Sequence, residues 1–214
     1  MTTPTPQKLT PALFTASIAK SNFSHILFDL DGTLVDSAPG IIDALSMTLS
    51  SNGLRPVCEL KEAIIGPPLD DMLRIISGIN DAAILKILTE TFKKHYDEGG
   101  YKKTRLFPGI NEMLHSLRNR GYTLHITTNK RLKPTILILN HFGCSTLFTS
   151  VYSIDKALPA YTNKTVMLLD QLADQSIEVK GAVYVGDSDG DRVAAEENKL
   201  HFIRAVWGYK DMTP

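Results

Sequence analysis

Hydrophobic residues in this chain occur in short runs that alternate with longer amphipathic stretches. A short apolar run bounded by turn residues predicts a buried strand, and apolar residues recurring every three or four positions predict a helix. The predicted strands are 25–28, 122–127, 147–153, 182–186 and 201–206. Helices are predicted between them at 108–120, with Pro108 as the first helical residue, and at 132–141, 162–175 and 189–198. This alternation predicts an α/β fold: a Rossmann-like, doubly wound parallel sheet with helices on both faces.

One long stretch breaks the alternation. Between the first two predicted strands the pattern is helical only, with segments at 39–52, 60–65, 70–77 and 81–97. An ordinary crossover is much shorter, so this stretch is expected to form a separate all-α cap over the end of the first strand. The predicted organisation is an N-terminal tail at 1–22 with one short helix at 12–20, a core at 23–36 and 104–214, and a helical cap at 37–103.

Composition narrows the function classes. The chain has 214 residues, is 43% hydrophobic and 21% charged, and carries no formal net charge, so no basic excess favours nucleic acid or an anionic membrane. It has no signal-peptide pattern and no apolar stretch long enough to span a bilayer. Its two cysteines show no metal-type spacing. We expect a cytoplasmic monomer or homodimer that acts on a small molecule, with neither nucleic acid nor membrane as a partner.

Two acidic clusters each follow an apolar run. Asp29 and Asp31 come directly after the first predicted strand, and Asp187, Asp189 and Asp191 follow the strand at 182–186. Ligands of open α/β sheets bind at the carboxyl ends of the strands, where these carboxylates would repel one another without a cation between them. Carboxylates with open positions suit Mg²⁺, which is usually held by one or two of them plus a substrate phosphate. The sequence therefore predicts metal-assisted phosphoryl chemistry.

Structural explanations compete with this hypothesis. Asp31-Gly32 is by itself a common turn signal, and the spacing of the second cluster imitates the start of a calcium-binding loop. The calcium explanation fails because Arg192 takes the place of the required glycine and Asn198 that of the glutamate. Asp189 is therefore predicted to cap the following helix rather than to bind metal.

The motifs resemble those of a known family. The segment Phe28-Asp29-Leu30-Asp31-Gly32-Thr33 is similar to the opening motif of haloacid dehalogenase superfamily phosphatases, and Gly186-Asp187-Ser188-Asp189-Gly190-Asp191 to their closing acidic motif. His125-Ile126-Thr127-Thr128-Asn129-Lys130 resembles their strand-end Ser/Thr motif. The position of the helical stretch matches the cap of the branch related to phosphoglycolate phosphatase.

The resemblance implies a role for each motif residue. Asp29 would be the nucleophile that forms an aspartyl-phosphate, and Asp31 the general acid and base. Asp29, the backbone carbonyl of Asp31, Asp187 and Asp191 would hold Mg²⁺, with Asp191 as a ligand or an outer-shell residue. Thr128 and Asn129 would bind phosphoryl oxygens, while Thr127 packs. Gly32 permits the tight turn, and Gly66, beside Pro67-Pro68, is a candidate substrate contact from the cap.

A lysine should neutralise the remaining negative charge, and the sequence leaves three candidates. The family often places it in a Lys-Pro pair, which is absent from the corresponding segment. Lys164, at the start of a predicted helix, is preferred, and Lys156 and Lys130 are the alternatives.

Several activities share this fold. Asp31 argues against a dehalogenase, which needs no second aspartate there, and against a phosphonate hydrolase, which would lack an acid at this position. A sugar-phosphate mutase shares both aspartates, and a catalytically silent binding module is a further alternative. The sequence favours a phosphatase of a small phosphorylated metabolite. A phosphoglycolate-like substrate is preferred over a nucleoside 5′-monophosphate.

Overall fold

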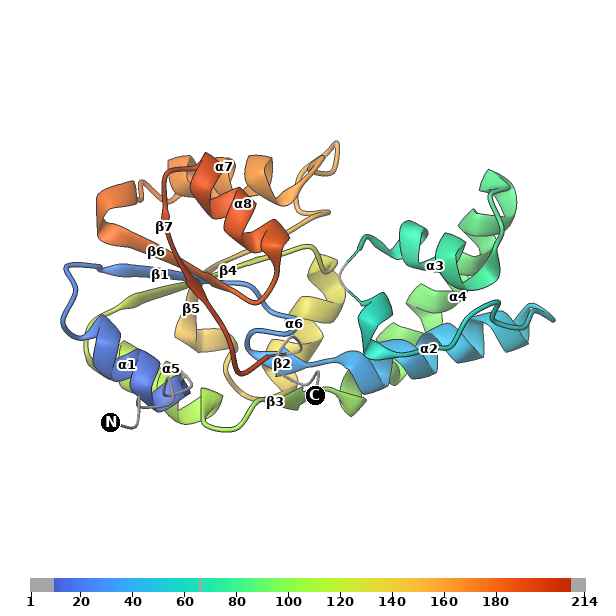
Figure 1. Ribbon diagram of the computed structural model, residues 1–214, viewed down its shortest axis with the longest axis horizontal. Coiled ribbons are helices and arrows are strands. Elements are labelled where there is room, and N and C mark those ends of the chain that lie inside the picture. The colour runs from blue at the N-terminus through green and yellow to red at the C-terminus, as the bar shows by residue number, and fades with distance from the viewer. Residues whose placement is uncertain (1–9, 66, 209–214) are drawn as a thin grey trace, which may run out of the picture.

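The core of the protein is a five-stranded parallel sheet. The computed structural model describes residues 10–65 and 67–208. The strands of the sheet are β1 (His25–Phe28), β4 (Thr123–Thr128), β5 (Phe148–Ser153), β6 (Ala182–Gly186) and β7 (His201–Arg204), in the order β5-β4-β1-β6-β7. The helices between them cover both faces (Figure 1). The predicted α/β class with a doubly wound parallel sheet is confirmed.

Strand β1 lies at the centre of the sheet. Phe28, its last residue, is in register with Ile126 of β4 on one side and Val185 of β6 on the other. The chain runs outward from β1 to β4 and β5, then returns across the sheet to β6 and β7. This reversal brings the carboxyl ends of β1, β4 and β6 together, which is where ligands of such sheets bind.

The alternation of side chains along β1 builds two hydrophobic layers. Ile26 and Phe28 face a cluster formed with α1 (Pro11–Ile18), α5 (Ile110–Asn119) and α6 (Leu132–His141). Leu27 faces the opposite cluster, formed with α7 (Lys164–Asp174) and α8 (Asp189–Glu197). All three strand residues are fully buried, as expected for a central parallel strand.

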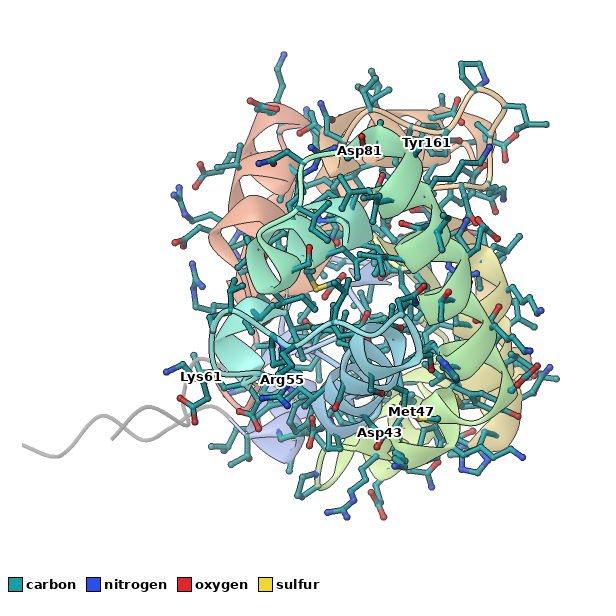
Figure 2. The ribbon with its side chains drawn as sticks, turned by 90° about the vertical axis from the view of Figure 1, so that its right-hand side faces the viewer. Asp43, Met47, Arg55, Lys61, Asp81 and Tyr161 are labelled. Atoms are coloured by element: carbon teal, nitrogen blue, oxygen red, sulfur yellow. The ribbon has the colours of Figure 1, made fainter. Side chains whose placement is uncertain are left out.

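The helical stretch forms a second structural unit, which we call the helical insertion (residues 38–103). Its elements are α2 (Ala38–Ser51), the 3-10 helix η1 (Glu62–Ile64), α3 (Leu69–Ser77), α4 (Ala82–Glu98) and the 3-10 helix η2 (Gly100–Lys103). It buries its own hydrophobic cluster, separate from the two of the sheet. Figure 2 views the molecule from this side, where charged residues such as Arg55, Lys61 and Asp81 are exposed on the outer surface.

Two short strands join the insertion to the core. β2 (Val35–Asp36) pairs antiparallel with β3 (Arg105–Leu106), so that the chain enters and leaves the insertion side by side. Neither strand was predicted, because two residues carry no periodicity. Two further 3-10 helices, η3 (Ser145–Leu147) and η4 (Val179–Gly181), precede β5 and β6.

The N-terminal helix belongs to the core, where the sequence predicted a tail. The short helix expected at 12–20 is present as α1, which packs against α5. Phe14 and Ile18 are buried, and the Phe14 ring meets the edges of Phe28 and Trp207. Phe14 and Ile18 lie four positions apart on one helix face, but the polar residues around them in the sequence gave no indication that this face packs against the core.

A predicted helix start and a predicted helix cap are wrong. α5 begins at Ile110, because Gly109 takes a left-handed conformation (φ 81°) that ends the preceding turn, and Pro108 lies outside the helix. α8 is capped by Ser188, so Asp189 is its first helical residue rather than the cap. Among the described residues, no helix combines the length and the apolar character needed to cross a bilayer.

Candidate active site

The acidic residues of the two clusters meet at the carboxyl edge of the sheet. Asp29 directly follows β1, Asp187 directly follows β6, and Asp191 lies in the first turn of α8. A Cβ atom on Gly186 would lie 2.5 Å from the Cβ of Asp191. Glycine at this position therefore lets the start of α8 approach the strand end closely.

Three carboxylates form a compact group that could hold a metal ion. Asp29, Asp187 and Asp191 each offer an oxygen, and these atoms lie within 4.8 Å of one another. All three residues are buried. Burial, together with the neighbouring carboxylates, raises the pKa of Asp29 well above its usual range and that of Asp187 to about 6. Several carboxylate oxygens in one place, without enough positive charge nearby to balance them, fit a hard divalent cation such as Mg²⁺.

Lys164 supplies one positive charge to this group. It begins α7, directly after the helix cap Asn163, and its Nζ lies 2.7 Å from Asp29 Oδ1 and 2.5 Å from Asp191 Oδ1. Burial by itself would lower the pKa of this lysine, but the two carboxylates raise it well above its usual value. One ammonium against three buried carboxylates leaves an excess of negative charge that a divalent cation would offset.

Asp191 is held by groups on both of its oxygens. Ser188 donates to Oδ2 from its backbone nitrogen (3.0 Å) and its hydroxyl (2.6 Å), and Asp191 N donates back to Ser188 Oγ in a capping box. Tyr184 donates to Oδ1 at 3.4 Å. Burial opposes ionisation, but Lys164 and Ser188 hold the pKa of Asp191 below its usual value. The residue is therefore fixed in its charged form.

Asp31 has separate partners. The Nζ of Lys130 lies 3.1 Å from both carboxylate oxygens, and the hydroxyl of Ser37 donates to Oδ1 at 2.5 Å. Lys130 also lies 4.7 Å from the centre of the Tyr96 ring in the helical insertion. Burial would lower the pKa of Lys130, but Asp31 raises it above its usual range. The Asp31 side chain is thus apart from the three-carboxylate group; metal binding by its backbone carbonyl remains a prediction.

The three candidate lysines have different surroundings. Lys164 contacts Asp29, and Lys130 contacts Asp31. Lys156 lies over the ring of Tyr152, 3.6 Å from its centre, and donates to Val151 O. It does not line the cavity described below.

The other predicted substrate contacts also differ in whether they line the cavity. Thr128 and Asn129 both line the cavity, and Thr128 Oγ1 accepts a hydrogen bond from Lys130 N. Thr127 points into the interior and donates to Gln171. Gly32 takes a left-handed conformation (φ 86°) in the turn after β1 and is absent from the cavity lining. Gly66 lies outside the described residues.

A cavity of about 610 Å³ lies between the sheet edge and the helical insertion. Its lining also includes Arg131, Ser188, Glu62 and several apolar residues of the insertion that sequence reasoning did not identify as functional. Arg131 directly follows the Thr-Asn-Lys segment, and this position next to the motif was the sequence signal that could have identified it. The insertion residues gave no signal beyond ordinary helical periodicity.

This geometry agrees with the family match. The sequence pattern of the haloacid dehalogenase-like hydrolases matches residues 26–205, which contain all three motifs. The chain belongs to this family. The predicted superfamily, with its phosphoglycolate-phosphatase-like branch, is thereby confirmed, and relatives named for that activity support the branch.

Three of its similar proteins illustrate the range within the family. The chain is 32% identical to a phosphoglycolate phosphatase of Aquifex aeolicus, over 86% of this chain and 85% of the relative. It is 28% identical to a 5′-nucleotidase of Pseudomonas aeruginosa, over 89% and 86%. Among solved structures, a predicted phosphoglycolate phosphatase from Haemophilus somnus superposes with a TM-score of 0.79 at 25% identity, covering 89% of this chain and 88% of that one.

Proposed function

We propose that the protein is a Mg²⁺-dependent phosphoric monoester hydrolase that works through an aspartyl-phosphate intermediate. The observation that carries this proposal is the grouping of Asp29, Asp187 and Asp191 around Lys164, in one cavity with Asp31. Family membership and relatives named phosphatases support the reaction class.

Each residue has a defined part in the reaction. A carboxylate oxygen of Asp29 attacks phosphorus, and the bond from phosphorus to the ester oxygen breaks. Asp31 gives a proton to the departing alkoxide and later takes one from the water that attacks the aspartyl-phosphate. The products are the alcohol and inorganic phosphate, and Asp29 is regenerated. Lys164, Thr128 and Asn129 orient the phosphoryl oxygens and offset their charge. Bound at the three carboxylates, Mg²⁺ would supply further charge stabilisation.

The helical insertion has the position of a cap over this reaction. It forms one side of the cavity, and Tyr96 of α4 lies over Lys130 of the core. Closure of such a unit excludes water during phosphoryl transfer, and its opening admits substrate. We propose a small phosphorylated metabolite as the partner, with phosphoglycolate and nucleoside 5′-monophosphates as the candidates that the relatives' names suggest.

The test is phosphate release by the purified protein with Mg²⁺. The substrates are phosphoglycolate, nucleoside monophosphates and sugar phosphates. Asp29→Asn and chelation should each abolish release, while Asp189→Asn, which changes the exposed aspartate of the same cluster, should preserve it. Hydroxylamine should trap the acyl-phosphate only when Asp29 is present.

Other outcomes would change the conclusion. Undiminished hydrolysis by Asp29→Asn would show that Asp29 is not the nucleophile. Turnover of a bisphosphate without phosphate release would indicate a mutase.

A further inference from the structure

The cavity has two chemically different ends. Its core end carries the charged residues described above. Its opposite end is formed by the helical insertion and is largely hydrocarbon. We call this surface the apolar wall; its members are Ile41, Ile65, Leu69, Met72 and Phe92. They come from α2, the segment after η1, α3 and α4, so the three longer helices of the insertion all contribute to it.

The cations that line the cavity are already paired. Lys164 and Lys130 contact aspartates of the catalytic group. Arg131 forms a two-pronged ion pair with Asp97 of α4, with contacts of 2.7 and 3.3 Å. The Asp97 side chain is only 8% exposed and also receives Lys133 at 3.4 Å. Among the described residues, then, every lining cation already has a carboxylate partner, with which a second anionic group on the substrate would have to compete.

The helical insertion contributes a negative charge to the cavity lining. Of the described residues that it contributes to the cavity lining, Glu62 is the charged one. A carboxylate on the leaving group would meet this glutamate and the apolar wall, and it would lose water without gaining a partner. Phosphoglycolate carries such a carboxylate one carbon away from the ester oxygen.

We propose that the preferred substrates are phosphomonoesters whose leaving group is uncharged and apolar, and longer than two carbons. This inference rests on the proposed phosphatase function and specifies its substrate class. The phosphoryl group lies at the charged end, and the hydrocarbon of the alcohol packs against the apolar wall. Each methylene buried there should tighten binding roughly fourfold.

Binding of non-hydrolysable phosphonates tests the inference without requiring turnover. The compounds are ethylphosphonate, hexylphosphonate and 6-phosphonohexanoate, measured by calorimetry with Mg²⁺. The last two share one chain and differ by a terminal carboxylate. Hexylphosphonate should bind at least tenfold more tightly than either of the others. Equal or tighter binding of 6-phosphonohexanoate would overturn the proposal, as would failure of hexylphosphonate to bind.

A charge variant sharpens the test. Glu62→Lys should raise the affinity for 6-phosphonohexanoate at least fivefold and leave that for hexylphosphonate within twofold. Glu59→Lys, at an exposed position three residues earlier, should change neither. If Glu62→Lys binds hexylphosphonate and 6-phosphonohexanoate with the same ratio of affinities as the unmodified protein, Glu62 does not disfavour carboxylated ligands.

Phosphate release from the matching esters separates the two proposals. Hexyl phosphate, ethyl phosphate and 6-phosphooxyhexanoate are assayed with Asp29→Asn as control. If the phosphonates discriminate as expected but no ester is cleaved, the phosphatase proposal fails and the pocket assignment stands. If phosphoglycolate or the carboxylated ester is cleaved best, in an Asp29-dependent manner, the phosphatase proposal stands and the substrate class is wrong.

Discussion

The two ends of the cavity are built from different interactions. At the core end, Asp191 has three polar partners on its two oxygens, and each bond depends on distance and direction. At the insertion end, the ring of Phe92 stacks on Tyr96 at 5.5 Å, and its neighbours meet through non-directional dispersion. Substitutions at the core end should therefore affect every substrate severely. Substitutions in the apolar wall should affect some substrates by small factors.

Among the substitutions that compare the two ends of the cavity, Lys164→Met should have the largest effect on activity. The variant leaves Asp29 and Asp191 buried without their cation, so activity on all esters should fall at least a hundredfold. Without Mg²⁺, the free energy of unfolding should fall by about 3 kcal/mol, as for other broken buried ion pairs. Urea denaturation with and without Mg²⁺ measures this, and added Mg²⁺ should restore part of the loss. Lys156→Met is the matched control, and an equal effect there would contradict the assignment.

Asp187→Asn should act chiefly on the metal. Loss of one of the three carboxylates should raise the Mg²⁺ concentration for half-maximal activity at least tenfold, because hard cations depend on ligand charge. A Mg²⁺ titration of phosphate release measures the shift. Asp189→Asn is the control, since Asp189 pairs with Arg204 and its side chain is 68% exposed. Equal Mg²⁺ requirements in the two variants would place the metal elsewhere.

Phe92→Leu should give a smaller and selective effect. The shorter side chain keeps the insertion folded but reduces contact with a long leaving group, so KM for hexyl phosphate should rise about threefold. KM for ethyl phosphate should change less, because its two-carbon group offers little hydrocarbon surface for the wall to contact. Steady-state kinetics with both esters measure the difference, and Phe202→Leu, in β7 away from the cavity, is the control. A parallel change for both esters would argue against the wall's role in selectivity.

The smallest effect on activity is expected from substitution of His125, which forms a pair with His25 in the sheet. His125 Nε2 lies 3.1 Å from His25 Nδ1, and its Nδ1 lies 2.8 Å from Ser150 Oγ. Burial, with a contribution from the adjacent His25, lowers the pKa of His125 from 6.5 to about 4. Between these values the unfolded chain binds a proton that the folded protein does not. The contribution of His125 should therefore lower the stability as the pH falls from about 6.5 to about 4, and below that range this contribution should stay constant.

The contribution of His125 to this decline should be roughly 2 kcal/mol. Urea denaturation at pH 7 and pH 4.5 measures it, with His125→Gln as the comparison, because other titrating groups are common to both proteins. The variant should lose less stability over this interval, with little change in activity at pH 7. An identical decline in both proteins would show that His125 already titrates normally.

Local signals were enough to predict the sheet and the acidic residues at its carboxyl edge. The apolar runs before Asp29 and Asp187 predicted two buried strands, and the carboxylates at their ends predicted a common site; the structure brings these residues together. Short or capped elements were predicted less well. The two-residue strands β2 and β3 have no period to detect, and the choice between Ser188 and Asp189 as cap depends on backbone geometry.

The sequence by itself determined the fold class, the order of the motifs and the residue types at the strand ends, because periodicity and chain order are local properties. Only the tertiary structure decided which lysine meets Asp29 and which meets Asp31. It also decided that Arg131 is neutralised by Asp97, and that residues from α2, α3 and α4 form one apolar wall. These pairings join positions far apart in the chain, and their energy depends on distances that exist only after the insertion has packed against the core.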